Sequence, residues 1–224
     1  MLNFIVDLID YTMEFSAPAG PVHTMSKRPI CDKYMIFGES RKLIDPKTYE
    51  IFCDVFETVY YPIANYFNYG LPRYVEYVID PEYKGVAYTD CKKVVLNPEW
   101  IAKHPWDVDC MTHEVIHCFQ AYKHPVPMWL MEGICDYGRE LFGLYNKESG
   151  WALPAYNEKH NYEMGYRVTG SFLRWMDAEY SPRFVYDLNN AIKVGKYTDN
   201  YFKEVTGKTI DELWAQYAKA NSPK

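Results

Sequence analysis

Three features that often identify a protein class are missing from this sequence: a CxxC cysteine pair, a long apolar run and a cluster of basic residues. Without a CxxC pair, we do not expect a cysteine zinc knuckle, although six cysteines are present. No apolar run reaches the roughly 18 residues of a membrane span, so we predict none. The first ten residues carry two aspartates and no basic residue, so we expect no secretory signal peptide there.

The charge balance argues against a nucleic-acid partner. The net charge is -6 at pH 7, and basic residues occur at most two in a row, as at Lys92 and Lys93. Binding of a phosphate backbone needs a clustered surface of Lys and Arg. We therefore expect neither DNA nor RNA as a ligand.

The composition is that of a folded globular protein with one main domain. Hydrophobic residues make up 48% and charged residues 24% of the 224 residues, which argues against a disordered chain. Single hydrophobic cores usually hold about 100 to 200 residues, so one core is sufficient. Residues 1–46 are interrupted by Pro and Gly, and we predict that they form an N-terminal extension packed on the main domain, 47–224.

The hydrophobic pattern of the main domain changes from strands to helices along the chain. Residues 47–69 have apolar side chains at helical spacing and are predicted to be mostly helical despite Pro62. Residues 73–79 and 93–96 are predicted strands, with turn chemistry between them at Gly85 and Thr89-Asp90. This order predicts an α+β fold, with a small sheet before a mainly helical C-terminal half. Further helices are expected at 107–123, 128–142, 161–180, 182–194, 197–206 and 209–220.

The first of these C-terminal helices carries the motif HEVIH, from His113 to His117. Apolar residues three or four apart, such as Met111 and Val115, indicate its buried face. The two histidines lie about 200° round from that face and about 6 Å apart along the axis, so one zinc ion can bind both. Glu114 follows His113 directly, beside the metal, where the general base for a zinc-bound water belongs.

The third ligand separates the classes of HExxH enzyme. A metzincin would need a histidine at position 123 and a glycine at position 120, where this sequence has Lys123 and Gln120, so we reject that class. In the next predicted helix, Glu132 and Asp136 share one face. This is the gluzincin arrangement, in which Glu132 completes a His2Glu set and Asp136 accepts the remaining N–H of one imidazole. The alternative, Asp136 as the ligand with Glu132 beside it, stays open.

The helix predicted at 128–142 is mostly apolar, and it contains Gly133 and Gly138. Each glycine lowers helix stability by roughly 1 kcal/mol, which favours close packing against a neighbouring helix as the reason for its presence. Cys118 and Cys135 are expected to be buried as small hydrophobic residues.

Six segments of the main domain carry a family resemblance. They are GVAYTD (85–90), KKVVLN (92–97), MTHEVIHCFQ (111–120), WLMEGICDYGR (129–139), GYRVTGSFLRWMD (165–177) and YFKEVTGKTIDELWAQY (201–217). In this order they resemble the plant basic secretory proteins and their bacterial relatives, which are classed as peptidases of plants and bacteria. The resemblance covers roughly residues 75–217 and does not include the first 45 residues.

The resemblance implies a zinc-dependent, gluzincin-like metallopeptidase with a zincin-like fold. It assigns zinc to His113, His117 and Glu132 and catalysis to Glu114, in agreement with the spacing argument. Family members are generally secreted, which implies a secreted or periplasmic protein. The family name refers to basic proteins, whereas this chain is acidic.

The predicted reaction is hydrolysis of a bond in a peptide or protein substrate. Glu114 takes a proton from the zinc-bound water and delivers it to the leaving amine. The oxyanion needs a further hydrogen-bond donor, for which Tyr166 is the first candidate and His160 the second. By analogy with the superfamily, residues 93–96 are expected to form the edge strand that binds the substrate backbone.

Two other functions fit the same residues. A binding or defence protein could keep the zinc fold without catalysis, although the presence of Glu114 counts against this. A zinc hydrolase of a non-peptide amide would use the same chemistry, and no residue in the sequence identifies the specificity pocket.

Overall fold

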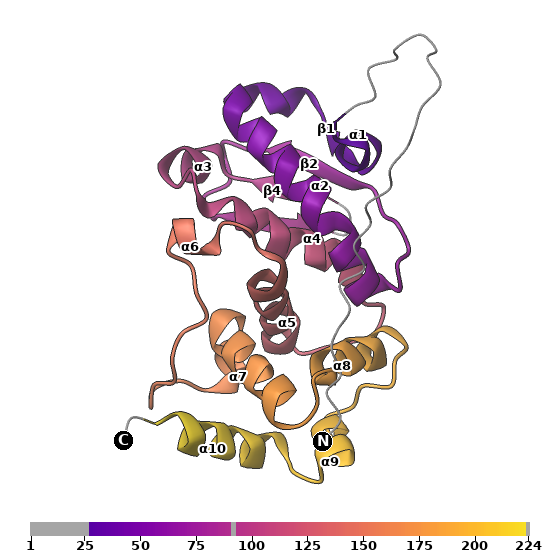
Figure 1. Cartoon of the computed structure of the whole chain (residues 1–224), viewed down its shortest axis with the longest axis vertical. Helices are drawn as coiled ribbons and strands as arrows, with labels where there is room; N and C mark the ends of the chain where they lie inside the picture. The colour runs from indigo at the N-terminus through magenta and orange to yellow at the C-terminus, as the bar shows by residue number, and fades with distance from the viewer. Residues whose placement is uncertain (1–26, 91–92, 223–224) are drawn as a thin grey trace, which may run out of the picture.

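The computed structural model describes residues 27–90 and 93–222, and Figure 1 shows it as an α+β protein with one small sheet and many helices. The predicted fold class, a small sheet followed by a mainly helical C-terminal half, is confirmed at this level. Cys91 and the first 26 residues of the predicted extension lie outside the described residues. None of the helices in the described ranges combines the length and the apolar character needed to cross a membrane.

A mixed four-stranded sheet forms one layer of the fold. The strands lie in the order β1-β2-β4-β3, and β3 is the only antiparallel member among the described strands. The edge strand next to β4 is therefore β3, and the prediction that residues 93–96 form the edge is wrong, because β4 pairs on both sides. The strands are β1 (Met35–Phe37), β2 (Val75–Ile79), β3 (Ala87–Asp90) and β4 (Lys93–Leu96).

Strand β3 contains the Thr89-Asp90 pair, for which the local sequence predicts a turn. Ala87 and Thr89 are half-buried and Tyr88 and Asp90 are exposed, which is the alternation of a strand with one covered face. The strand has only four residues, and two of them are polar, so the alternation of buried and exposed side chains is not recognisable in the sequence. Pairing with β4, from Ala87 opposite Leu96 to Asp90 opposite Lys93, overrides the local turn preference.

Helices cover the sheet and form the rest of the molecule. Beginning at Pro46, α2 runs through Pro62 without a break and packs against α4. Asp45 caps its first turn by accepting a hydrogen bond from the Thr48 N–H at 3.0 Å. The helices are α1 (Pro29–Tyr34), α2 (Pro46–Asn68), α3 (Pro98–Lys103), α4 (Cys110–Gln120), α5 (Met128–Phe142), α6 (Asn146–Ser149), α7 (Tyr166–Glu179), α8 (Phe184–Lys193), α9 (Tyr201–Thr206) and α10 (Ile210–Asn221), with 3-10 turns at Glu39–Leu43, Asp107–Asp109 and Tyr162–Met164.

The described part of the predicted extension, 27–46, contains α1, β1 and a 3-10 turn. Strand β1 pairs in parallel with β2, and α1 packs against α2. This segment therefore contributes one strand to the sheet of the main domain. The division of the chain at residue 46 remains a prediction.

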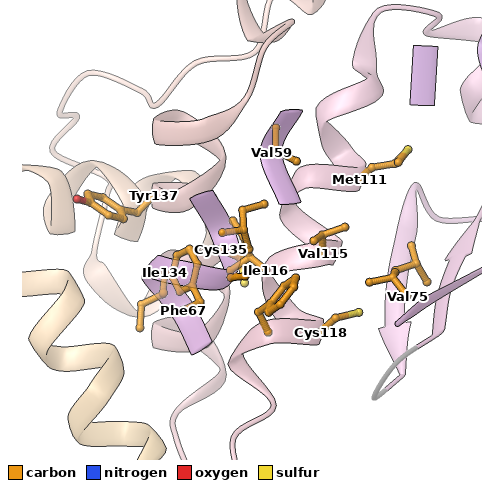
Figure 2. Packing of buried hydrophobic residues seen from close by; sticks show 14 of the residues in the cluster. Val59, Phe67, Val75, Met111, Val115, Ile116, Cys118, Ile134, Cys135 and Tyr137 are labelled. Carbon is orange, nitrogen blue, oxygen red and sulfur yellow. The ribbon is translucent and has the colours of Figure 1, made fainter. Parts of the chain in front are cut away.

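The core runs from the sheet through helices α2, α4 and α5 and continues into α7 and α8. Figure 2 shows Val75 of β2 on one side of α4, and Ile134 and Cys135 of α5 on the other. Cys118 and Cys135 are fully buried and unpaired, which confirms their prediction as small hydrophobic residues. Helix α4 is thus held between the sheet on one side and α5 on the other.

Helix α5 packs closely against its neighbours through its two glycines. A Cβ atom at Gly138 would lie 2.5 Å from the terminal methyl of Ile116 on α4 and 2.9 Å from Phe67 on α2. At Gly133 it would lie 2.3 Å from Cγ2 of Thr169 on α7. The predicted close packing is confirmed, and it holds α5 against three helices.

Helix α4 is shorter than the predicted 107–123. It ends at Gln120 because Ala121 adopts a left-handed conformation, with φ of 38°, and its N–H bonds back to the carbonyl of His117. The Nζ of Lys193, from α8, donates to the carbonyls of Phe119 and Gln120, both at 2.8 Å. These bonds satisfy two carbonyl groups that the end of the helix leaves free.

Candidate metal centre and active site

His113 and His117 project from the face of α4 that is turned towards α5. Met111 and Val115 are buried on the other side of the helix, as the spacing predicts. The two imidazole rings lie with their centroids 4.9 Å apart at an interplanar angle of 73°. One turn of helix therefore places both rings around the same small volume.

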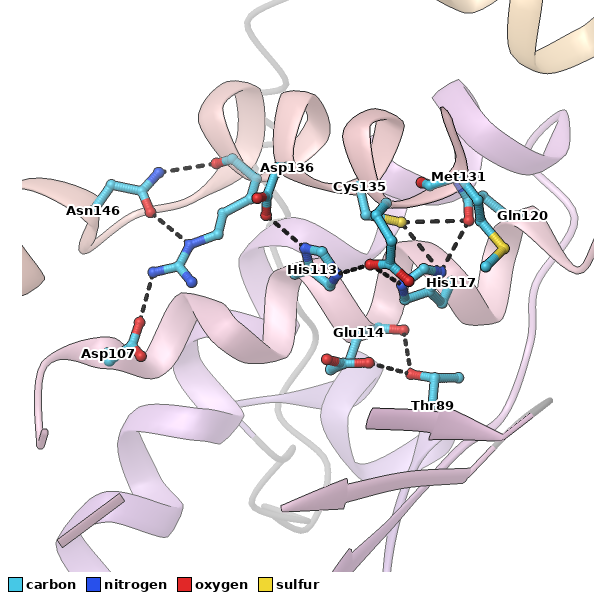
Figure 3. A network of polar contacts seen from close by, with 12 residues as sticks. Thr89, Asp107, His113, Glu114, His117, Gln120, Met131, Cys135, Asp136 and Asn146 are labelled. Carbon is cyan, nitrogen blue, oxygen red and sulfur yellow. Dashed lines mark hydrogen bonds and ion pairs between the residues drawn. The ribbon is translucent and has the colours of Figure 1, made fainter. Parts of the chain in front are cut away.

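Helix α5 brings Glu132 and Asp136 to these histidines, and Figure 3 shows Asp136 beside His113. Oδ1 of Asp136 lies 2.7 Å from Nδ1 of His113. Oε2 of Glu132 lies 3.2 Å from Nε2 of His113 and 3.3 Å from Nε2 of His117. The two carboxylates thus contact different ring nitrogens: Asp136 lies behind His113, and Glu132 lies between the two rings.

The second nitrogen of His117 faces a separate pair of side chains. Oε1 of Gln120 lies 3.1 Å from Nδ1 of His117, and Sγ of Cys135 lies 3.3 Å from the same nitrogen. Nε2 of Gln120 donates to the carbonyl of Met131 on α5, which holds the amide in place. Both Nδ1 atoms therefore have a partner, and both Nε2 atoms converge on Glu132.

This cluster could hold a metal ion. His113, His117 and Cys135 offer ligand atoms that all lie within 4.8 Å of one another, in the part of the chain that the structure describes. Glu132 is another candidate for the third ligand, because its Oε2 lies 3.2 Å from Nε2 of His113 and 3.3 Å from Nε2 of His117. Imidazole, thiolate and carboxylate are all ligands that zinc accepts in proteins.

The charges around His113 favour a cation at this place. Burial lowers the pKa of His113, but its hydrogen bonds to Asp136 and Glu132 outweigh burial and raise that pKa to about 10. Burial raises the pKa of Glu132, but the bonds from His113 and His117 lower it to about 2. The carboxylates thus stabilise positive charge between the rings, whether a proton or a metal ion supplies it.

Glu114 is held by the edge strand of the sheet. Its side chain is buried, with 7% of the residue exposed, and Oε2 accepts a hydrogen bond from the Thr89 hydroxyl at 2.7 Å. The same hydroxyl lies 3.0 Å from the backbone carbonyl oxygen of Glu114. Thr89 therefore links β3 to Glu114, which lies between His113 and His117 in the sequence of α4 (Figure 3).

Tyr166 reaches the site from the start of α7. Its ring lies 6.3 Å from the His113 ring, at an interplanar angle of 15°, and 55% of the residue is exposed. Burial raises the pKa of its hydroxyl, and the nearby Glu132 and Glu114 charges raise it further, so the group is a neutral hydrogen-bond donor at neutral pH. His160 is not among the residues that line the cavity beside the site.

An open cavity of about 830 Å³ adjoins this cluster. His113, Glu114, Asp136 and Tyr166 all form part of its wall. A ligand of peptide size in this cavity can reach His113 and Glu114, whereas His117 is not part of the wall.

Three residues at the site did not follow from the sequence. Gln120 could have been found, because it lies three residues after His117 and shares its helical face. No local pattern in the sequence indicates that Thr89 belongs to the site, since its contact with Glu114 depends on how β3 packs on α4. The sequence predicts that Cys135 is buried, but its contact with His117 depends on how α5 packs against α4.

The fold and the site together define an α+β protein with a candidate metal centre at the wall of an open cavity. Residues 71–217 match the family model described as Peptidase of plants and bacteria. The chain belongs to this family, and the resemblance seen in the sequence is confirmed. Comparison with curated proteins and with solved structures found no match.

Proposed function

We propose that this protein is a zinc-dependent peptidase of the gluzincin type, with His113, His117 and Glu132 as zinc ligands and Glu114 as the general base. The observation that carries the proposal is the convergence of both Nε2 atoms on Oε2 of Glu132, at 3.2 and 3.3 Å, beside the cavity. The peptidase character of the family supports the reaction class.

The distances favour Glu132 over Cys135 as the third ligand. Tetrahedral zinc with bonds of about 2.0 to 2.1 Å has ligand atoms about 3.3 Å apart, close to the separations of Oε2 from the two Nε2 atoms. Sγ of Cys135 lies against Nδ1 of His117, the nitrogen that also faces Gln120. An imidazole that binds zinc through Nε2 usually donates its Nδ1–H to an outer partner, so Cys135 lies on the wrong side of the ring.

The same argument places Asp136 outside the ligand set. Its contact is with Nδ1 of His113, at 2.7 Å, whereas Nε2 of that ring faces Glu132. A carboxylate at this distance accepts the Nδ1–H, fixes the tautomer and makes Nε2 a better ligand. Asp136 and Gln120 thus have equivalent tasks on the two histidines.

The protein residues supply the remaining chemistry. Bound zinc supplies Lewis acidity, which makes water nucleophilic near neutral pH and polarises a peptide carbonyl. Glu114 accepts the proton that the attacking water loses and returns it to the leaving nitrogen. Thr89 holds the Glu114 carboxylate during this transfer, and the Tyr166 hydroxyl donates a hydrogen bond to the developing oxyanion.

Strand β3 is the proposed support for the substrate backbone. The N–H of Asn97 donates to the Val86 carbonyl, so Val86 belongs to a hydrogen-bonded pair of the antiparallel ladder. Because such pairs alternate along a strand, the N–H and C=O groups of Ala87 and Thr89 point away from β4. The Ala87 carbonyl accepts from the Tyr83 hydroxyl at 3.1 Å. An extended peptide that pairs at Thr89 would pass directly beside Glu114.

Metal dependence with a peptide library tests the proposal. The purified protein is stripped with a chelator, dialysed and divided into samples with and without one equivalent of zinc, and each sample is incubated with a mixed peptide library. We expect cleavage in the zinc sample and none in the stripped sample. Zinc binding without cleavage of any peptide would favour a silent binding protein, and hydrolysis confined to non-peptide amides would favour the other alternative.

A further inference from the structure

The wall of the cavity combines aromatic rings with a few charged side chains. The aromatic members are exposed to different degrees, and Trp106 and Tyr166 are about half exposed. The aromatic residues of the wall are Tyr83, Trp100, Trp106, Trp151 and Tyr166.

Two of the three Lys and Arg side chains on this wall already have anionic partners. Lys103 forms an ion pair with Glu99 at 2.6 Å, within α3. Arg139 pairs with Asp107 at 2.6 Å and lies over the Trp151 ring at 4.4 Å. These two side chains are therefore engaged in contacts within the protein.

Arg167 is different from the other cations of the wall. It is exposed, and among the described residues it has neither an ion pair nor a hydrogen bond to its side chain. It directly follows Tyr166, whose ring lies parallel to that of His113. Arg167 thus lines the cavity beside the candidate catalytic centre, without an ion pair in the described part of the chain.

We propose that Arg167 binds a carboxylate of the substrate, so that the enzyme prefers peptides with Asp or Glu close to the scissile bond. This inference rests on the proposed peptidase function. The planar guanidinium can donate two parallel hydrogen bonds to a carboxylate, which a lysine or an amide cannot reproduce. Arg167 directly follows Tyr166, whose ring lies 6.3 Å from that of His113, so we expect the acidic residue within a few positions of the cleaved bond.

The acidic side chains of the wall limit where the substrate carboxylate can lie. Asp107 and Asp136 are paired with Arg139 and His113. Glu148, near Trp151, is exposed and has no ion pair within the described residues. A substrate carboxylate is therefore favoured beside Arg167 and disfavoured beside Glu148. We expect the preference for an acidic residue to apply at one position of the peptide only.

Matched peptides and matched variants test this inference. The peptides form pairs that differ only by Glu or Gln at one position, and Kd, together with kcat/KM for each peptide that is cleaved, is measured with the full-length, zinc-loaded protein. The wild type should favour Glu by roughly tenfold at one position. Arg167→Gln should reduce that ratio to about one, and Arg167→Glu should invert it, so that the Gln peptide is preferred over the Glu peptide. Lys103→Gln removes a paired cation of the same wall and should leave the ratio unchanged.

The outcomes separate this inference from the function on which it rests. Equal binding of Glu and Gln peptides by the wild type at every position, or a ratio that survives Arg167→Gln, would overturn the role of Arg167. A binding preference that disappears in Arg167→Gln, without cleavage of any peptide, would support the role of Arg167 and contradict the peptidase proposal.

Discussion

The hydroxyl of Thr89 lies 2.7 Å from Oε2 of Glu114, and this contact joins the edge strand of the sheet to the carboxylate of the proposed general base. Glu114 lies on the helix that carries both histidines, so its backbone position is fixed by α4. Its carboxylate, however, has rotatable bonds of its own, and the contact with Thr89 restricts them. Orientation of the base thus depends on packing between strand and helix, in addition to the HEVIH motif.

Replacement of Thr89 by valine should lower kcat by about tenfold, because the carboxylate loses the bond that orients it. Valine has the same shape as threonine, so KM and zinc content should stay within about twofold. Thr89→Ser keeps the hydroxyl and should retain most of the activity. Steady-state kinetics on one cleaved peptide measure these effects, and equal activity of the valine and serine variants would contradict the orienting role.

Zinc retention in three variants tests the assignment of the ligands. Glu132→Ala removes a proposed ligand and should weaken zinc binding most. Asp136→Ala removes an outer partner of His113 and should weaken it by about 10- to 100-fold. Cys135→Ala should change it little. Competition with a chromogenic chelator gives the three affinities, and a larger loss in the Asp136 or Cys135 variant than in Glu132→Ala would overturn the assignment.

The sequence predicted the helical part of the site well, because helical periodicity is a local property. The spacing of His113 and His117 placed both rings on one face, and the spacing of Glu132 and Asp136 placed both carboxylates opposite them. The limits of α5, Met128–Phe142, agree with the predicted 128–142. Distances of four residues within a helix require no knowledge of the rest of the fold.

The sheet and the cavity were harder to predict, because they depend on contacts between distant segments. The local sequence around Thr89 predicts a turn. Its place in a strand depends on pairing with β4 and on its contact with α4. Strand 93–96 was predicted correctly as a strand, but its internal position depends on β3, which the sequence analysis missed. No pattern in the sequence distinguishes Arg167, and its proposed role in binding the substrate depends on its place in the cavity wall.

Gly133→Ala should destabilise the protein although alanine favours helices. A Cβ atom would lie 2.3 and 2.5 Å from Cγ2 and Cβ of Thr169, a stiff, fully buried residue. Overpacking of this kind costs about 1 to 3 kcal/mol, against a helix-propensity gain of about 1 kcal/mol. Chemical denaturation measures the change in unfolding free energy, and a stabilised variant would contradict the packing.

Gly138→Ala provides the comparison for this prediction. Its closest neighbour is the terminal methyl of Ile116, at the end of a flexible side chain. Rotation of that methyl group relieves part of the contact, although Phe67 at 2.9 Å restricts it. We expect a smaller loss of unfolding free energy than for Gly133→Ala, and a larger loss would show that α5 is held chiefly by α4 and α2.

Lys193 should make stability depend on pH in the alkaline range. Burial, together with the charge of Arg73, lowers the pKa of Lys193 from 10.5 to about 8. Between these values the unfolded chain binds the proton more strongly than the folded protein does, so the free energy of unfolding rises with pH. Because the side chain is only half-buried, the rise should be about 1 kcal/mol.

Denaturation of the wild type and Lys193→Met at several values from pH 7 to 10.5 measures this effect. The variant lacks the titrating amine, so the difference between the two proteins isolates the contribution of Lys193. The wild type should gain stability relative to the variant as the pH rises. A constant difference would show that the charged amine is stabilised by the carbonyls of Phe119 and Gln120 as well as it is by water.

The most direct test of the proposed chemistry is the activity of Glu114→Gln with its zinc content measured in the same sample. Glutamine has nearly the same shape as glutamate but cannot accept the proton, and loss of a general base costs about 10²- to 10⁴-fold in rate. We expect about one zinc per chain in both proteins and a loss of kcat in this range for the variant. A zinc-loaded Glu114→Gln protein that cleaves peptides as fast as the wild type would contradict the assignment of Glu114 and of the active site built around it.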